Sequence, residues 1–276
     1  MGGGVVKFLV NLYAEITLRT QGRAFCRLYN FRAYLKGIDT RFKISGDKFG
    51  YVAHSPLLTQ SFVQEKQGLN AYYYGLEERG KLLAQSYFID RINFLVDDCI
   101  IECGGNVGDL SIYFRLYHPG VSLTVFEPSR TEFLSLEKNI TPWLAIQKGL
   151  HNLNGQAKFY VSEAHADSLL IPPKVYESEE IVDVIRLDSY ISGPVKLLKI
   201  EAEGSEPEVL EGASGILNLV QYICVDMGPE RGPEELSTAV EVINFLTISG
   251  FDLKYFDALS CKGLFENRKL ISKVTY

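Results

Sequence analysis

The chain has 276 residues, a length that fits one large domain or a domain with an extension. Hydrophobic residues make up 46% and charged residues 22%, which excludes a disordered chain, a collagen-like sequence and a disulfide-stapled miniprotein. The net charge of −6 argues against a general nucleic-acid binder, because such a protein needs a basic surface to neutralise phosphates.

The N-terminal segment Val5–Leu18 is apolar but is interrupted by Lys7, Asn11 and Glu15, and it is too short to span a bilayer. No small-residue cleavage site follows it, so a signal peptide fits poorly. The opening Met-Gly resembles a myristoylation start but lacks Ser or Thr at position 6. We favour a helix that docks or forms a homodimer, and a helix lying on a membrane surface is the alternative.

The chain divides near residue 95. Before that point the pattern predicts a helix over Val5–Lys36, a strand pair over Phe42–Ala53 turning at Gly46-Asp47, and a helix over Gln60–Leu83. The aromatic run Tyr72–Tyr74 packs these elements in the favoured interpretation. In the alternative it stacks on a sugar or an extended apolar substrate.

From Asp98 onward, apolar strands alternate with amphipathic helices. We predict strands at Cys99–Cys103, Ser122–Phe126, Ala145–Lys148, Ala157–Val161, Val195–Ile200, Tyr222–Asp226, Leu253–Phe256 and Leu270–Val274. Helices are predicted over Val107–Tyr117, Arg130–Asn139, Glu206–Leu217 and Glu234–Ile248. This alternation implies an α/β fold with a mostly parallel sheet that is covered on both faces.

Cysteine usage points away from metal and redox chemistry. The five cysteines contain neither a C-x-x-C pair nor a Cys/His cluster with zinc spacing. We therefore expect no metal site and a reducing, cytoplasmic environment. The cysteines are Cys26, Cys99, Cys103, Cys224 and Cys261.

The first of these strands ends in a glycine-rich turn, Glu102-Cys-Gly104-Gly105-Asn106-Val-Gly108. Glycines permit a tight turn and close approach of a ligand, and the following helix offers its N-terminal amides to an anionic group. The spacing differs from the nicotinamide fingerprint G-x-G-x-x-G. A turn of this kind is either a ligand site or only a close-packed connection.

Acidic residues follow two further strands. Glu127 ends the second strand, where a carboxylate is placed to bind two ribose hydroxyls or to cap the next helix. Glu201, Glu203 and Glu206 follow Lys199-Ile200 at the same sheet edge as the glycine turn. Crowded carboxylates raise one pKa towards that of a general base, although acids at a helix N-terminus are the simpler interpretation. The P-loop pattern of ATP and GTP enzymes is missing.

In order along the chain, these motifs resemble those of the FkbM family of S-adenosylmethionine-dependent methyltransferases. The family pattern is D-x-G-A-N-x-G, then F-E-P, then K-I-D-x-E-G-x-E with L-x-G-A, and the resemblance covers Asp98 to Gly232. This chain has Glu102 and Glu201 at the two aspartates and Gly105 at the alanine.

The resemblance implies a Rossmann-like class I methyltransferase sheet, mostly parallel and seven-stranded, over residues 96–276. We expect residues 1–95 to form a mainly helical extension that covers the substrate or dimerises. The cofactor that the resemblance implies is S-adenosyl-L-methionine. The methionine end is expected to contact Glu102, Gly104, Asn106 and Gly108, and the ribose Glu127. Gly105 and Pro128 are further expected cofactor contacts. The stretch His165-Ala166-Asp167-Ser168 is expected near the adenine, with Asp167 and Ser168 as its cofactor-binding residues.

Transfer of a methyl group needs an aligned acceptor, removal of a proton and exclusion of water, and no metal is chemically required. Glu203 is the first candidate base, with Glu201, Glu206 and Glu230 behind it. Asp226 is expected to face the same cleft. Lys199 either holds one of these acids ionised or is a simple strand-end lysine. His54 and His151 are interpreted as surface or core histidines.

By this resemblance the acceptor is a hydroxyl of a sugar, a glycan or a polyketide-type small molecule. The acidic balance suits a neutral or cationic acceptor. A nucleic-acid acceptor is not expected, because no D/N-P-P-Y/F segment follows the fourth strand. Two alternatives remain: a non-catalytic protein of the same fold that binds and assembles, and a nicotinamide-dependent oxidoreductase, which the glycine spacing disfavours.

Overall fold

A computed structural model describes residues 20–46, 49–63, 69–162 and 167–271 of the chain. The predictions for Val5–Leu18, for the Met-Gly start and for His165-Ala166 lie outside these residues. The chain forms two compact units, residues 1–79 and 80–276. The expected role of residues 1–95 as a substrate cover or a dimerisation element stays a prediction.

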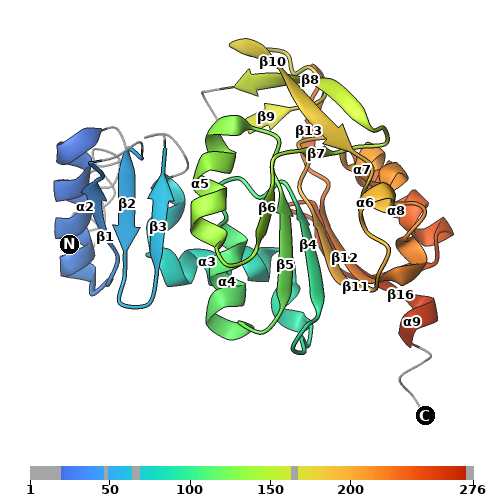
Figure 1. Cartoon of the computed structure of the whole chain (residues 1–276), viewed down its shortest axis with the longest axis horizontal. Helices are drawn as coiled ribbons and strands as arrows, with labels where there is room; N and C mark the ends of the chain where they lie inside the picture. The colour runs from blue at the N-terminus through green and yellow to red at the C-terminus, as the bar shows by residue number, and fades with distance from the viewer. Residues whose placement is uncertain (1–19, 47–48, 64–68, 163–166, 272–276) are drawn as a thin grey trace, which may run out of the picture. The chain divides into compact units, whose positions relative to one another are not determined.

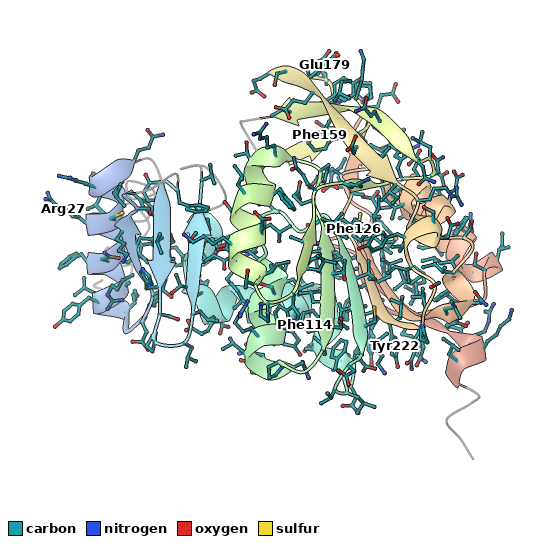
Figure 2. All side chains as sticks on the ribbon, in the orientation of Figure 1. Arg27, Phe114, Phe126, Phe159, Glu179 and Tyr222 are labelled. Carbon is teal, nitrogen blue, oxygen red and sulfur yellow. The ribbon has the colours of Figure 1, made fainter. Side chains whose placement is uncertain are left out.

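In the first unit, helix α2 (Gly22–Lys36) contacts a three-stranded antiparallel sheet of β1 (Arg41–Ile44), β2 (Tyr51–His54) and β3 (Thr59–Phe62). The 3-10 helix η1 (Leu69–Tyr72) and the start of α3 (Leu76–Ser86) follow. The predicted strand pair is confirmed. The side chain of Arg27 on α2 projects away from the sheet (Figure 2).

The core of this unit is aromatic. The ring of Phe42 contacts those of Phe25, Tyr29, Phe62 and Tyr72 at centroid distances of 5.3, 4.5, 5.9 and 6.1 Å. Tyr72 is fully buried there, whereas Tyr74 is 61% exposed, so the packing interpretation of the tyrosine run holds for Tyr72 but not for Tyr74. The helix predicted from Gln60 is wrong at its start, because Phe62 fills this core from β3 and the helix begins only at Leu76.

The second unit is built on a seven-stranded sheet in the order β15-β16-β12-β11-β4-β5-β6 (Figure 1). The strands are β4 (Cys99–Cys103), β5 (Ser122–Phe126), β6 (Leu144–Ile146), β11 (Val195–Ile200), β12 (Val220–Asp226), β15 (Phe251–Asp257) and β16 (Lys262–Asn267). Strand β16 runs antiparallel to both β12 and β15, and the other six strands all point the same way. The expected fold class, a mostly parallel Rossmann-like sheet of the class I methyltransferase type, is confirmed.

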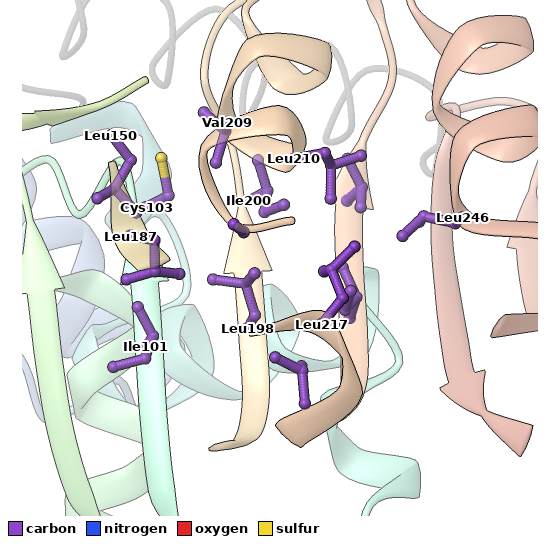
Figure 3. Close-up of a cluster of buried hydrophobic side chains, with 14 of the residues drawn as sticks. Ile101, Cys103, Leu150, Leu187, Leu198, Ile200, Val209, Leu210, Leu217 and Leu246 are labelled. Carbon is purple, nitrogen blue, oxygen red and sulfur yellow. The ribbon is translucent and has the colours of Figure 1, made fainter. Parts of the chain in front are cut away.

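Helices cover both faces of this sheet. On one face Ile101, Leu198 and Ile200 pack against Val209 and Leu210 (Figure 3). That face is covered by α6 (Leu187–Tyr190), α7 (Glu206–Gly212) and α8 (Ala239–Ile248), and the other by α3, α4 (Asp109–Tyr117) and α5 (Arg130–Ile140). Short helices η2 (Ile89–Arg91), η3 (Leu217–Leu219) and α9 (Arg268–Ile271) complete the unit.

Alternation along the strands decides which side chains meet. Ile100 and Leu197 belong to the core under α4 and α5, whereas Ile101 and Leu198 belong to the opposite core. Because alternate residues of a strand share a face, Glu102 and Lys199 lie on the same side as Ile100 and Leu197.

A smaller four-stranded sheet is inserted between β6 and β11. Its order is β7-β10-β8-β9, with β7 (Gly149–Leu150), β8 (Gly155–Ser162), β9 (Asp167–Leu169) and β10 (Ser178–Ile185). The sequence predicted only part of β8 in this sheet. Strand β10 escaped prediction because it starts with the polar residues Ser178–Glu180 and because Asp183 interrupts the apolar residues that follow.

Three further predictions at the C-terminal end need correction. The helix predicted over Glu206–Leu217 ends at Gly212. The helix predicted from Glu234 begins at Ala239, because β14 (Leu236–Ser237) pairs with β13 (Pro229–Arg231). The described part of the strand predicted at Leu270–Val274 is helix α9, and the partner of β15 is β16, whose Leu264 and Phe265 are buried. Among the described residues, none of the helices combines the length and the hydropathy needed to cross a membrane.

Candidate active site

The glycine turn after β4 is locked against the end of β11. Gly104 has a φ of 73°, a left-handed conformation that favours glycine. A Cβ atom at this position would lie 2.0 Å from the carbonyl oxygen of Glu201. The turn therefore needs glycine for two reasons, its backbone conformation and the close approach of the two strand ends.

The same turn is also bound to the end of β5. The amides of Gly104 and Gly105 both donate to the carbonyl oxygen of Phe126, at 3.0 and 3.2 Å. A Cβ atom on Gly105 would lie 2.0 Å from Cγ1 of Val125. An alanine here, as in the family pattern, therefore requires Val125 to move.

Glu127 holds this turn to the start of α5. One of its carboxylate oxygens accepts a hydrogen bond from the amide of Asn106 at 2.8 Å, and the other accepts one from the amide of Ser129 at 2.9 Å. The side chain is 7% exposed, and burial raises its pKa to about 8. The N-cap of α5 is Ser129, so Glu127 does not cap that helix.

A buried lysine joins the ends of β4 and β11. The sheet register places Lys199 directly opposite Glu102. Its Nζ atom lies 3.3 Å from Oε1 of Glu102 and 2.6 Å from Oε2 of Glu201, and it donates to the carbonyl oxygen of Gly104 at 2.8 Å. An ammonium group has three N–H donors, so these three partners use all of them. The contacts support the interpretation that Lys199 holds an acid ionised.

The two carboxyl groups beside Lys199 are driven to opposite protonation behaviour. Burial raises the pKa of Glu102 to about 7, although Lys199 acts in the opposite sense. For Glu201, burial alone would raise the pKa, but Lys199 and Lys262 lower it to about 2. Burial alone would also lower the pKa of Lys199, and Glu201 and Glu102 reverse that effect and raise it.

One oxygen of this cluster lacks a hydrogen-bond partner. Oε2 of Glu102 is buried and finds no donor among the described residues, while the whole side chain is 1% exposed. A buried acceptor left without a donor costs about 1–3 kcal/mol. The site can therefore gain free energy by binding an N–H or O–H donor at this oxygen, next to the glycine turn.

Tyr87 and Lys262 extend the cluster, and the sequence analysis missed both. The hydroxyl of the fully buried Tyr87 hydrogen-bonds to Glu201 and lies 3.4 Å from Oδ2 of Asp226. Nζ of Lys262 lies 3.0 Å from the same oxygen of Asp226 and 4.2 Å from the centroid of the Tyr87 ring. Tyr87 precedes the motifs, and Lys262 belongs to the unpredicted strand β16. The structure sets Lys262 in register opposite Asp226, a pairing that no sequence pattern indicated.

The three remaining candidate acids have different surroundings. Oε1 of Glu206 accepts hydrogen bonds from the amides of Ala202 and Gly204 at 3.1 and 3.0 Å, and Oε2 accepts one from Thr238 at 3.0 Å. Glu206 is 1% exposed, so it fixes the loop between β11 and α7. Glu203 and Glu230 are half-buried, and Glu203 has a left-handed φ of 49°.

The residues expected near adenine lie in the smaller sheet. Asp167 and Ser168 form part of β9 and pair with Ser162 and Val161 of β8, and their roles stay predictions. Pro128 lies beside β7: a Cβ atom added to Gly149 would be 3.6 Å from Cβ of Pro128.

The two histidines make their described contacts outside the cluster of Glu102, Lys199 and Glu201. His54 lies on β2 in the first unit and makes a 2.9 Å hydrogen bond with the hydroxyl of Thr59. His151 follows β7, and its amide donates to the carbonyl oxygen of Ile185. Within the described residues, no group of three or more His, Cys, Asp and Glu side chains is arranged to hold a metal ion.

The family model described as the methyltransferase FkbM domain matches residues 102–253, more than half of the chain. The chain belongs to the FkbM methyltransferase family. The cofactor of this family is S-adenosylmethionine. The matched segment contains the glycine turn, Glu127, Lys199 and the loop from Glu201 to Glu206.

Individual relatives are more distant. Methyltransferase 1 from Beauveria bassiana (strain ARSEF 2860) is 24% identical over 194 residues, which are 55% of this chain and 75% of that protein. The structure of the methyltransferase FkbM from Methylobacillus flagellatus KT is 16% identical to this chain, with a TM-score of 0.42. The match covers 63% of this chain and 44% of that protein, so this chain spans less than half the length of that relative. A SAM-dependent methyltransferase structure from Aquifex aeolicus is 11% identical, with a TM-score of 0.39 over 69% and 97% of the two chains. The family assignment depends on the domain match.

The Lys199→Met variant tests the buried cluster. It leaves the buried carboxyl group of Glu102 and that of Glu201, whose side chain is 31% exposed, without their cation. The free energy of unfolding should therefore fall by about 3 kcal/mol. The matched control is Lys158→Met, because Lys158 lies 3.0 Å from Glu179 in an ion pair whose side chains are 61% and 39% exposed. That control should lose less than about 1 kcal/mol.

Both variants are measured by urea unfolding. Adding Glu201→Gln to Lys199→Met should restore part of the loss, because Glu201 is the carboxyl group whose ionised form Lys199 stabilises. Equal losses for Lys199→Met and Lys158→Met would contradict this account of the cluster.

Proposed function

We propose that the chain transfers the methyl group of S-adenosylmethionine to a hydroxyl oxygen of a sugar, a glycan or a polyketide-type small molecule. The observation that carries the proposal is the unpartnered buried oxygen of Glu102 on β4, directly before the glycine turn. This arrangement fits a ligand that brings a cationic N–H donor close to the backbone.

The chain's own residues supply contacts for two ends of the cofactor. Glu102 is proposed to accept a hydrogen bond from the ammonium group of the methionine end, which satisfies Oε2. Glu127 is proposed to bind the ribose hydroxyls, because each carboxylate oxygen can accept more than the single amide hydrogen bond that it has within the chain. When bound, S-adenosylmethionine supplies an electrophilic methyl group.

The remaining task of the chain is to orient the acceptor hydroxyl and to take its proton. Glu201 is a weak base at neutral pH, because Lys199 and Lys262 hold its pKa at about 2. Glu206 already uses both oxygens to hold its loop. Glu203 is therefore the proposed base, with Glu230 as the next choice. A neutral acceptor is favoured because the chain carries a net charge of −6.

Cofactor binding is tested by calorimetric titration of S-adenosylhomocysteine into the full chain. Binding in the micromolar range, about −8 kcal/mol, is expected for the unmodified chain. Glu127→Ala should abolish it, because that variant removes the proposed ribose ligand. Glu137→Ala is the matched control, since Glu137 is an exposed acid on α5, and it should bind as the unmodified chain does.

Failure of the unmodified chain to bind S-adenosylhomocysteine would contradict the proposal. Binding of NADH in a parallel titration, without binding of S-adenosylhomocysteine, would also contradict it. Binding without any methyl transfer in the next experiment would favour a non-catalytic protein that binds the cofactor and assembles.

Oxygen transfer is tested with methyl-labelled S-adenosylmethionine and a panel of free sugars, glycosides and hydroxylated polyketides. The label should appear as an O-methyl group in the product. Glu203→Gln should lower kcat by roughly 100-fold to 10,000-fold while the affinity for S-adenosylhomocysteine stays unchanged. Glu234→Gln, an exposed acid near the same loops, is the control. Unchanged kcat in Glu203→Gln would remove Glu203 from the proposed role, and label on nitrogen or on RNA would contradict an oxygen acceptor.

A further inference from the structure

Helix α2 has two chemically different faces. Phe25, Cys26, Tyr29, Arg32 and Ala33 are buried against the first unit. The opposite side follows helical spacing and forms what we call the outer face of α2. It consists of Arg23, Arg27, Phe31, Tyr34 and Leu35.

The outer face of α2 combines exposed apolar surface with positive charge. The side chains of Phe31, Tyr34 and Leu35 are 56%, 73% and 64% exposed. Arg23 and Arg27 are exposed beside them, and Arg27 projects away from the sheet (Figure 2). The helix contains no Asp or Glu, and Lys36 adds a further cation in its last turn.

The first unit, which contains α2, is basic, whereas the rest of the chain is acidic. Residues 1–79 contain 11 Lys and Arg and 6 Asp and Glu, a net charge of +5. Residues 80–276 contain 17 Lys and Arg and 28 Asp and Glu, a net charge of −11. A chain that is acidic overall thus carries its basic excess in the unit that exposes this face.

We propose that the outer face of α2 binds the surface of an anionic phospholipid membrane. Phe31, Tyr34 and Leu35 enter the boundary between headgroups and acyl chains, and Arg23 and Arg27 pair with lipid phosphates. Apolar side chains flanked by arginines on an exposed helix face are the composition that such interfacial binding requires. The inference does not depend on the proposed function or on residues 1–19.

Two other occupants fit this face less well. A second copy of α2 would bring arginines against arginines with no acid on the helix to compensate. A nucleic acid would leave three large apolar side chains without partners, because phosphate binding uses cations and polar groups. An anionic bilayer satisfies both the charge and the apolar surface.

The test is flotation of the full chain with two kinds of vesicle, phosphatidylcholine alone and phosphatidylcholine mixed with phosphatidylglycerol. We expect binding to the mixed vesicles only, weakening as salt is added because salt screens the charges. Arg23→Gln combined with Arg27→Gln should lower the partition coefficient roughly 30-fold, at about 1 kcal/mol for each arginine. Tyr34→Ser combined with Leu35→Ser should lower binding to background.

The matched control replaces two exposed apolar residues on another helix. Val240 and Ile248 of α8 are 75% and 87% exposed, and Val240→Ser with Ile248→Ser should leave flotation unchanged. The thermal unfolding midpoint of each variant shows whether it is folded. A second pair on the same outer face, Phe31→Ser with Arg27→Gln, replaces either α2 variant that does not fold.

Several outcomes would overturn the proposal. These are absence of binding to the mixed vesicles, equal binding to both vesicles, and equal loss of binding in the α8 control. Self-association in sedimentation that the Tyr34→Ser and Leu35→Ser pair abolishes would assign the face to a second copy. Displacement from the mixed vesicles by RNA at low salt, together with tight RNA binding, would assign it to a nucleic acid.

Discussion

Lys199 is the constraint on which the rest of the site depends. Its ammonium group is 1% exposed and its three donors bind Glu102, Glu201 and the carbonyl oxygen of Gly104. A lone charge at such a depth costs several kcal/mol, so the lysine tolerates burial only if all of its partners stay in place. The parallel register of β4 and β11 meets this requirement by setting Lys199 opposite Glu102.

The loops around this lysine are fixed by contacts that leave little freedom. The ends of β4 and β11 lie so close together at Gly104 that no side chain fits between them. Glu206 holds the loop after β11 by accepting hydrogen bonds from the amides of Ala202 and Gly204. Arg231 of β13 adds a double ion pair with Glu208 and donates to the carbonyl oxygen of Gly204. A carboxylate beside a glycine turn thus stays in position without a bound ligand, which is what a preorganised site needs.

Sequence patterns predicted the parts of the molecule that local chemistry determines. The strands ending at Cys103, Phe126 and Ile200 follow from apolar runs, and the turn glycines and Glu127 follow from their positions at strand ends. The contacts of Tyr87 and Lys262 could not be predicted, because they depend on the antiparallel strand β16 and on a residue before the motifs. The periodicity of Thr59–Phe62 does not distinguish strand from helix. This segment is a strand because it pairs with β2 and because Phe62 is buried in the aromatic core. Strand β10 was missed for another reason, because polar residues at its start and Asp183 break up its apolar residues.

The central claim is that burial raises the pKa of Glu102 while Lys199, together with Lys262, lowers the pKa of Glu201. Carboxyl-carbon NMR of the full chain tests this claim most directly. The chain is labelled at the side-chain carbon of glutamate, and the two signals are assigned with Glu102→Gln and Glu201→Gln. From an ordinary pKa of 4.5, the account predicts titration of Glu102 near pH 7 and of Glu201 near pH 2. Titration of both groups near their ordinary pKa would contradict it.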